Sequence, residues 1–203
     1  MRKPEKAGLD PWHYPRPELA DAYLQAFGLK LTSARGLFAR RRMGKTEFLR
    51  HDLLPAAIAA GYLVAYTNLW DSRSAPDAAL VAALAEALEP QGVKAVLAKF
   101  AGPVRKVRAS AKMPGGVEGA LEAEWVHAVS DRAEALREVL KQLDKHNKPL
   151  LLVIDEAQVL AAESHYDFAH ALRAALDIRK ESIKVIFAGS SETTLREMFA
   201  RAS

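Results

Sequence analysis

Leu150 to Ile154 form a run of five consecutive apolar residues, and two acids, Asp155 and Glu156, follow it directly. A strand that is apolar at every position must be covered on both faces, which is typical of a central strand in a parallel sheet. A second run, residues 183–187, is apolar at every position except Lys184 and also indicates a buried strand. The two runs together predict a protein built around a parallel sheet, with a pair of acids at the end of one strand.

The pattern of apolar residues predicts four buried strands that alternate with helices. The strands are expected near residues 35–39, 62–67, 150–154 and 183–187. Apolar residues before and between the strands recur at helical spacing, as in the segment framed by Pro17 and Gly28. This alternation favours a parallel α/β architecture, in which ligands bind at the carboxyl ends of the strands.

Two helix boundaries carry local signals. Pro55 is expected to kink or restart the helix that follows Phe48, because proline lacks the amide hydrogen that a helix needs. Ser74-Ala75-Pro76-Asp77 has the spacing of a capping box with an acid in its last place. It predicts a helix that begins there with Ser74 as its cap.

Ala39-Arg40-Arg41-Arg42-Met43-Gly44-Lys45-Thr46 lies between an expected strand and an expected helix. A loop in this position that ends in Gly-Lys-Thr is typical of a phosphate cradle, because backbone amides and the helix N-terminus surround an anion. Lys45 would reach the outer phosphates and the Thr46 hydroxyl would hold Mg²⁺. Ala39 stands where the pattern has its first glycine, which is harmless if its φ is negative and strained if it is positive.

Hydrolysis of ATP also needs a carboxylate near Mg²⁺, a second carboxylate that acts on water, and a polar group near the γ-phosphate. Asp155 is the candidate for the first role and Glu156 for the second. Ser190 and Ser191, which follow the last expected strand, are candidates for the third. The alternative interpretation of the acid pair is a cap for the following helix.

Three segments carry a resemblance to a known family, namely Arg40 to Thr46, Leu151-Leu152-Val153-Ile154-Asp155-Glu156-Ala157-Gln158, and Phe187-Ala188-Gly189-Ser190-Ser191. They look like the Walker A, Walker B and sensor 1 segments of P-loop ATPases of the AAA+ and STAND kind, and in particular of the archaeal-type ATPase family. The resemblance extends from about Tyr14 to the end of the chain. It implies a sheet in the order 5-1-4-3-2 and a lead-in, Trp12 to Leu19, that lies near the adenine.

The resemblance and the residue chemistry together define the expected site. The expected nucleotide-binding residues are Tyr14, Arg41, Arg42, Met43, Gly44, Lys45, Thr46 and Glu47. The expected Mg²⁺ ligands are Thr46 and Asp155, and the expected catalytic residues are Lys45, Glu156, Ser190 and Ser191. ATP and ADP are the expected ligands, with Mg²⁺ as cofactor.

The expected fold is a three-layer P-loop NTPase α/β fold with a mostly parallel sheet. One ATPase core domain would span residues 1–203, with a lead-in and first helix over 1–28 and a β-hairpin insertion over 101–127. Members of the family continue into a fifth strand and a helical lid. We therefore expect this chain to be a piece of a longer protein, without its lid and with the first strand at an open sheet edge.

The expected hairpin has a turn at Met113-Pro114-Gly115-Gly116-Val117. One register pairs basic with acidic residues across it, as Lys112 with Glu118, Arg108 with Glu122 and Lys106 with Glu124. Such ion pairs within the hairpin would engage basic side chains of the acid-free segment Pro90 to Val117. The alternative is that this segment binds nucleic acid.

Composition and charge limit the other classes of protein to which the chain could belong. The chain has no cysteine, which excludes disulfides and Cys-ligated zinc and agrees with a cytoplasmic location. Its charged N-terminus is no signal peptide, and prolines and polar residues interrupt each long apolar segment, so no membrane span is expected. The six histidines show no metal-ligand spacing. The net charge of +4 is unevenly spread, and the arginines at 40–42 either bind phosphates or a neighbouring subunit, or lie in solvent.

The leading functional hypothesis is the ATPase core of a regulatory or DNA-associated machine. DNA or a protein is the expected partner, with oligomerisation through the ATPase domains. One alternative is a STAND-type switch that is held by bound nucleotide and turns over slowly. The other is a non-enzymatic interaction module with a residual nucleotide site.

Overall fold

The computed structural model describes residues 13–88 and 132–194. In chain order the regular elements are α1 (Pro17–Gly28), β1 (Ala34–Phe38), α2 (Lys45–Phe48), a π-helical turn (Leu49–Leu53), α3 (Leu54–Ala59), β2 (Leu63–Asn68), α4 (Pro76–Ala87), a helix over residues 132–143, β3 (Leu150–Asp155), two 3₁₀ turns (Ala157–Ala161 and Glu163–His165), α7 (Tyr166–Ile178) and β4 (Ile183–Gly189). The hairpin expected over 101–127 and the N-terminal residues 1–12 lie outside the described residues.

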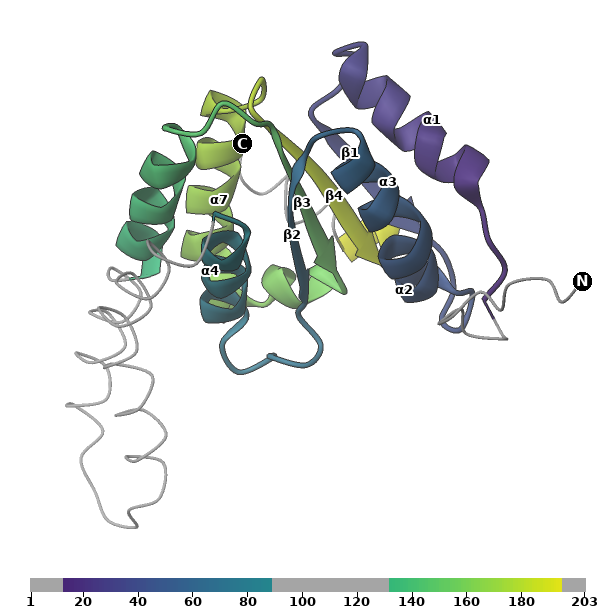
Figure 1. The fold of residues 1–203 in the computed structure, drawn as a ribbon. Coiled ribbons are helices and arrows are strands. Elements are labelled where there is room, and N and C mark those ends of the chain that lie inside the picture. The colour runs from purple at the N-terminus through teal and green to yellow at the C-terminus, as the bar shows by residue number, and fades with distance from the viewer. Residues whose placement is uncertain (1–12, 89–131, 195–203) are drawn as a thin grey trace, which may run out of the picture.

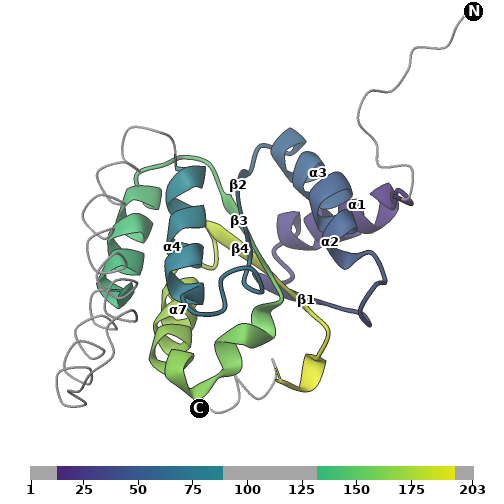
Figure 2. The same cartoon turned by 90° about the horizontal axis from the view of Figure 1, so that it is seen from below.

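The four strands form one sheet in the order β1-β4-β3-β2, and every pairing is parallel. This confirms the expected α/β class and the expected placement of the first strand beside the fourth. The sheet separates two layers of helices, with α1, α2 and α3 on one face and α4, α7 and the 132–143 helix on the other (Figures 1 and 2). None of the described helices is long and apolar enough to cross a membrane.

The apolar run of β3 serves both layers. Leu151 and Val153 pack in the cluster under α1, α2 and α3, whereas Leu150, Leu152 and Ile154 pack in the cluster under α4 and α7. All five are at most 1% exposed. Alternate side chains of a strand point to opposite faces, so a strand covered on both sides is apolar throughout.

The helix after the loop changes type just before Pro55. α2 passes through the π-helical turn Leu49–Leu53 into α3, with Pro55 near the start of α3. The wider turn accommodates a residue that lacks an amide hydrogen and whose ring would crowd the carbonyl of the preceding turn. α-Helix thus resumes at Leu54, with Pro55 in its first turn, which agrees with the expected restart.

The prediction that Ser74 caps the following helix is wrong. α4 begins at Pro76 with Ala75 in the cap position, and no side chain caps it. The Asp77 carboxylate instead accepts hydrogen bonds from the Ala78 amide, at 2.9 Å, and from Arg132 Nη1, at 2.6 Å. The buried acid thus joins α4 to the 132–143 helix, a tertiary contact that local spacing does not show.

Candidate functional site

The loop from Ala39 to Gly44 joins β1 to α2 at the carboxyl edge of the sheet (Figure 1). Gly44 has left-handed backbone angles, φ 68° and ψ 29°, which glycine adopts without steric cost. Across the described ranges, the non-glycine residues with positive φ are Lys30, Arg42 and Glu156. Ala39 is not among them, so its Cβ in place of the expected glycine causes no backbone strain.

Lys45 opens α2, and its side chain is almost fully buried under the loop. Its Nζ donates to the carbonyl oxygens of Ala39, at 2.9 Å, and Arg40, at 3.4 Å. No acid in the described part of the chain lies within ion-pair distance of this ammonium. A buried cation held only by neutral carbonyls favours an anionic ligand at the same place.

Asp155 ends β3 and is fully buried. Its Oδ2 accepts from Thr46 Oγ1 at 2.7 Å and from the Tyr66 hydroxyl at 3.3 Å, and its Oδ1 accepts from the Glu156 amide at 3.0 Å. Burial, and then the charge of Asp155, raise the pKa of Tyr66 to about 12, so its hydroxyl remains a donor at neutral pH. The fold thus brings together the two residues expected to hold Mg²⁺.

The chemistry of this pair fits Mg²⁺. A hydroxyl and a carboxylate oxygen 2.7 Å apart are hard donors, and Mg²⁺ sites in phosphate-binding proteins use only one or two protein ligands, with water and phosphate completing the shell. Among the described residues there is no cluster of three or more His, Cys, Asp or Glu that could hold a metal by itself. The pair therefore resembles a site shared between protein and a phosphate ligand.

Glu156 begins the 3₁₀ turn after β3 with left-handed backbone angles, φ 54° and ψ 41°. Its side chain does not cap that turn, which argues against the alternative interpretation of the acid pair as a helix cap. The carboxylate instead accepts a hydrogen bond from Gln158 Nε2, which also lies 3.5 Å from Ser190 Oγ. Non-glycine residues held in this conformation often occur at functional sites.

A cavity of about 390 Å³ opens between these elements. Its lining residues are Arg41, Arg42, Gly44, Lys45, Thr46, Glu47, Asn68, Trp70 and Glu156. Seven of the nine were expected from the sequence. The other two come from the end of β2 and the turn after it.

Asn68 and Trp70 were missed for different reasons. Asn68 ends β2 in register with Asp155, so the polar residue at the end of a strand beside the acid was a usable signal. Trp70 lies in the following turn, where its amide donates to Asn68 Oδ1 at 3.0 Å and its ring contacts the guanidinium of Arg41. No spacing rule points to that aromatic residue.

The remaining expected site residues lie outside this lining. Met43 is 60% exposed and Tyr14 is 80% exposed. Of the two serines, Ser190 is the one near Gln158, whereas Ser191 Oγ lies 2.7 Å from Thr194 Oγ1 and accepts from the Thr194 amide at 3.3 Å. Ser190 thus lies near Gln158 outside the cavity lining, whereas Ser191 contacts the start of the next helical turn.

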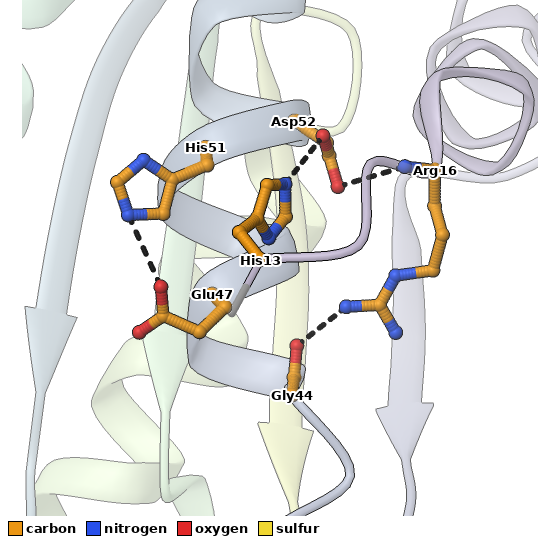
Figure 3. A network of polar contacts seen from close by, with 6 residues as sticks. All are labelled: His13, Arg16, Gly44, Glu47, His51 and Asp52. Carbon is orange, nitrogen blue, oxygen red and sulfur yellow. Dashed lines mark hydrogen bonds and ion pairs between the residues drawn. The ribbon is translucent and has the colours of Figure 1, made fainter. Parts of the chain in front are cut away.

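The lead-in is tied to the phosphate loop by a network that the sequence did not reveal (Figure 3). His13 Nε2 and the Arg16 amide hydrogen-bond to the two oxygens of Asp52, at 3.0 and 3.1 Å. The Arg16 guanidinium donates to the Gly44 carbonyl at 2.7 Å and lies over the Phe48 ring. The segment before α1 is therefore attached to the π-helical turn and to the last residue of the loop.

A second hollow of about 500 Å³ lies along β1 and α7. It is lined by apolar residues such as Phe38 and Leu176, and contains neither the buried lysine nor the acid pair. Size alone would favour it, but the titratable and phosphate-binding groups converge on the smaller cavity. We take the smaller cavity as the functional site.

The comparisons with known proteins add little to this geometry. No protein-family model matches the sequence, and no curated protein matches it. Among solved structures, the chain is similar to the Walker-type ATPase PABY2304 of Pyrococcus abyssi, with 16% sequence identity and a TM-score of 0.46 over 93% of this chain. The match covers 49% of that protein, so the chain spans about half the length of the structure it resembles.

Proposed function

We propose that this protein binds ATP with Mg²⁺ and hydrolyses it to ADP and phosphate. The observation that carries the proposal is the 2.7 Å hydrogen bond from Thr46 to Asp155, two residues 109 positions apart in the chain. The hydroxyl follows a glycine-lysine turn, and the carboxylate ends a buried central strand. This combination of loop, cation and strand-end acid supports phosphate-bound Mg²⁺ better than it supports a purely structural contact.

Each group then has a separate task. Lys45, Arg41 and Arg42 would balance the charge of the phosphates, with the loop amides and the start of α2 around them. Thr46 and Asp155 would hold Mg²⁺, which supplies charge neutralisation for the phosphate oxygens when bound. Tyr14, Met43 and Glu47 remain proposed nucleotide contacts.

Hydrolysis requires activation of water near the outer phosphate. Glu156 lines the cavity and would orient the attacking water and accept its proton. Ser190 lies across from it, beyond Gln158, and would hydrogen-bond to the γ-phosphate. Ser191 remains a proposed contact of the same kind.

Thermal unfolding with Mg-ATP tests the binding step. A ligand at 100-fold its Kd stabilises the native state by about 2.7 kcal/mol, which for a chain of this length raises Tm by about 5 to 11 °C. Lys45→Ala should abolish the shift, and Lys141→Ala, at an exposed lysine of the 132–143 helix, should keep it. No shift in the unaltered protein, or an equal shift in Lys45→Ala, would refute nucleotide binding.

Phosphate release tests the hydrolytic step, with Glu156→Gln as the matched variant. The glutamine keeps the shape of the side chain but cannot accept the proton, so we expect binding to persist and turnover to fall by about 100-fold or more. Binding without turnover in the unaltered chain would instead favour a nucleotide-gated switch of the STAND type. Absence of both would favour an interaction module.

The surroundings of the cavity support a DNA partner. Arg40, Arg41, Arg42 and Arg73 are exposed, and within the described residues none lies within ion-pair distance of an acid. The guanidinium groups of Arg41 and Arg73 lie over the partly exposed ring of Trp70, at 5.0 and 3.0 Å from its centroid. Unpaired guanidinium groups beside an exposed aromatic ring are suited to phosphates and bases.

Binding of duplex DNA at two salt concentrations tests this part. With Arg41 and Arg42 on the nucleotide, two phosphate contacts, from Arg40 and Arg73, predict a loss of DNA affinity of about 10-fold between 50 and 200 mM salt. Replacing Arg40 and Arg73 by alanine should weaken binding and flatten the salt dependence, whereas Arg137→Ala on the 132–143 helix should not. Binding that is unaffected by salt would contradict the role of these arginines.

We further propose that the protein belongs to the AAA+ and STAND group, acts in the cytoplasm, and oligomerises through its ATPase domain as part of a regulatory machine. The proposal rests on the order of the three motifs and on the sheet order β1-β4-β3-β2. Sedimentation with and without Mg-ATP tests the oligomer. A particle that stays monomeric at all nucleotide concentrations would contradict it.

A further inference from the structure

Gln158 lies two residues after Glu156, within the 3₁₀ turn Ala157–Ala161. Its Nε2 is the donor to Glu156 Oε2 and lies 3.5 Å from Ser190 Oγ. In the described part of the chain, no other side chain hydrogen-bonds to the Glu156 carboxylate. One carboxamide thus stands between the expected general base and the serine expected at the γ-phosphate.

Chemistry determines the orientation of this carboxamide. If the oxygen were turned toward Glu156, it would face a carboxylate that can only accept hydrogen bonds, so the NH₂ group must be on that side. Gln158 Oε1 is consequently left buried without a hydrogen-bond partner among the residues that the structure describes. An orphaned buried acceptor of this kind is destabilising, so the arrangement is not explained by stability of the fold.

The backbone also directs the Gln158 side chain toward Glu156. Glu156 has positive φ, and the tight turn after it brings the residue two positions later back toward the end of β3. A glutamate side chain on its own populates several rotamers, and a single strong donor restricts them. The strained backbone and the orphaned acceptor both accompany the contact between Gln158 and Glu156.

We propose that Gln158 is a positioning residue, which holds the Glu156 carboxylate at a fixed place relative to Ser190. The proposal rests on the proposed function, because it concerns the same hydrolytic step. Gln158 does not accept the proton; it determines where the group that accepts it lies. Small displacements of a general base are costly, since a misplacement of about 1 Å can slow a reaction by about 100-fold.

Steady-state hydrolysis by the full chain tests this inference with Gln158→Ala and Gln158→Glu. The glutamate variant has the same shape but places a second carboxylate against Glu156. We expect kcat to fall by about tenfold or more in the alanine variant and further in the glutamate variant, with KM within about threefold of the unaltered protein. Gln142→Ala is the matched control, because Gln142 also donates to a glutamate, Glu138, but on the 132–143 helix.

A double-mutant cycle separates positioning from a structural role. In the Glu156→Gln background, Gln158→Ala should lower kcat by less than about twofold, because there is no base left to position. A merely structural role would lower kcat by the same factor in both backgrounds and would lower Tm. Should the alanine variant fail to fold, the isosteric glutamate variant carries the test.

The outcomes distinguish this inference from the proposed function. If the unaltered chain does not hydrolyse Mg-ATP, the proposed function fails and the inference is overturned with it. If the unaltered chain is active and both Gln158 variants keep kcat within about twofold, the inference alone is overturned. A fall in kcat at constant KM that disappears in the Glu156→Gln background supports it.

Discussion

Thr46→Val tests the contact on which the proposed site depends. Valine has nearly the shape of threonine but replaces the hydroxyl by a methyl group, so the substitution removes the 2.7 Å hydrogen bond to Asp155 Oδ2 and little else. Asp155 is 0% exposed, so water cannot replace the lost donor without entering the protein. The carboxylate would retain the Tyr66 hydroxyl and the Glu156 amide as donors.

The expected magnitude can be worked out from these contacts. A hydrogen bond to a charged, buried group contributes about 1.5 to 3 kcal/mol. In a chain of about 200 residues, this corresponds to a fall in Tm of about 3 to 12 °C without any ligand. Tyr66→Phe removes a longer, and therefore weaker, 3.3 Å bond to the same carboxylate and should cost less than Thr46→Val.

Denaturant unfolding of Thr46→Val, Asp155→Asn and the double variant measures the effect. The Thr46→Val loss should shrink to below about 0.5 kcal/mol in the Asp155→Asn background, because the charge that the hydroxyl serves is gone. The Mg²⁺ dependence of ATP binding should also weaken in Thr46→Val. A single variant within about 0.5 kcal/mol of the unaltered protein would refute the contact, and an equal loss in both backgrounds would refute its link to Asp155.

Two further predictions concern backbone strain and pH. Arg42→Gly should stabilise the ligand-free protein by up to about 1 kcal/mol, because glycine adopts a positive φ without strain. Ala39→Gly should instead destabilise it by about 0.4 to 1 kcal/mol, because there only the entropy of the unfolded chain changes. Urea unfolding should give changes in unfolding free energy of opposite sign for the two variants, and changes of the same sign would contradict the prediction. His165 has its pKa lowered from 6.5, mainly by burial, so the unfolded state binds more protons and stability should decline as pH falls below 6.5. That decline should be smaller in His165→Gln than in His170→Gln, an exposed control, and equal slopes in urea unfolding at pH 5 and 8 would contradict it.

The sheet could be predicted from sequence because its signals are local and redundant. A strand such as Leu150 to Ile154 is apolar at every position, and only burial on both faces explains that pattern. The Thr46 and Asp155 partnership was predictable for a related reason, because both residues end or follow elements whose order fixes them at one sheet edge. The proximity of Thr46 and Asp155 could therefore be predicted from the order of the strands, without knowledge of individual side-chain contacts.

Contacts between distant polar residues were not predictable in the same way. Asp77 was assigned to a helix cap from its spacing, but the fold gives it Arg132, which is 55 positions away. Arg16 had no signal at all, although it donates to the carbonyl of Gly44. Pairings of this kind depend on the docking of elements, and single-sequence patterns describe only the elements themselves.

The π-helical turn Leu49–Leu53 links the attachment of the lead-in to the position of Pro55. An extra residue in the turn rotates the rest of the helix about its axis, and Asp52 within the turn points toward the lead-in rather than along the helix surface (Figure 3). Pro55 accounts for the wider turn, since a regular helix would require the amide hydrogen that it lacks. Pro55 thus explains, through the wider turn that contains Asp52, how the lead-in is attached beside the loop.

The charges of the cavity argue for a ligand that carries both signs. The loop contributes Lys45, Arg41 and Arg42 to the cavity lining, where an anion is favoured, whereas Glu156, also in the lining, and the adjacent Asp155 are acidic. A simple anion would meet repulsion from the acids, and a simple cation would meet repulsion from the loop. A phosphate chain bound with Mg²⁺ would suit both signs of charge, because the cationic loop would hold the phosphate oxygens and Thr46 and Asp155 would hold the metal. The charge distribution of the cavity is therefore compatible with the Mg-nucleotide proposed above.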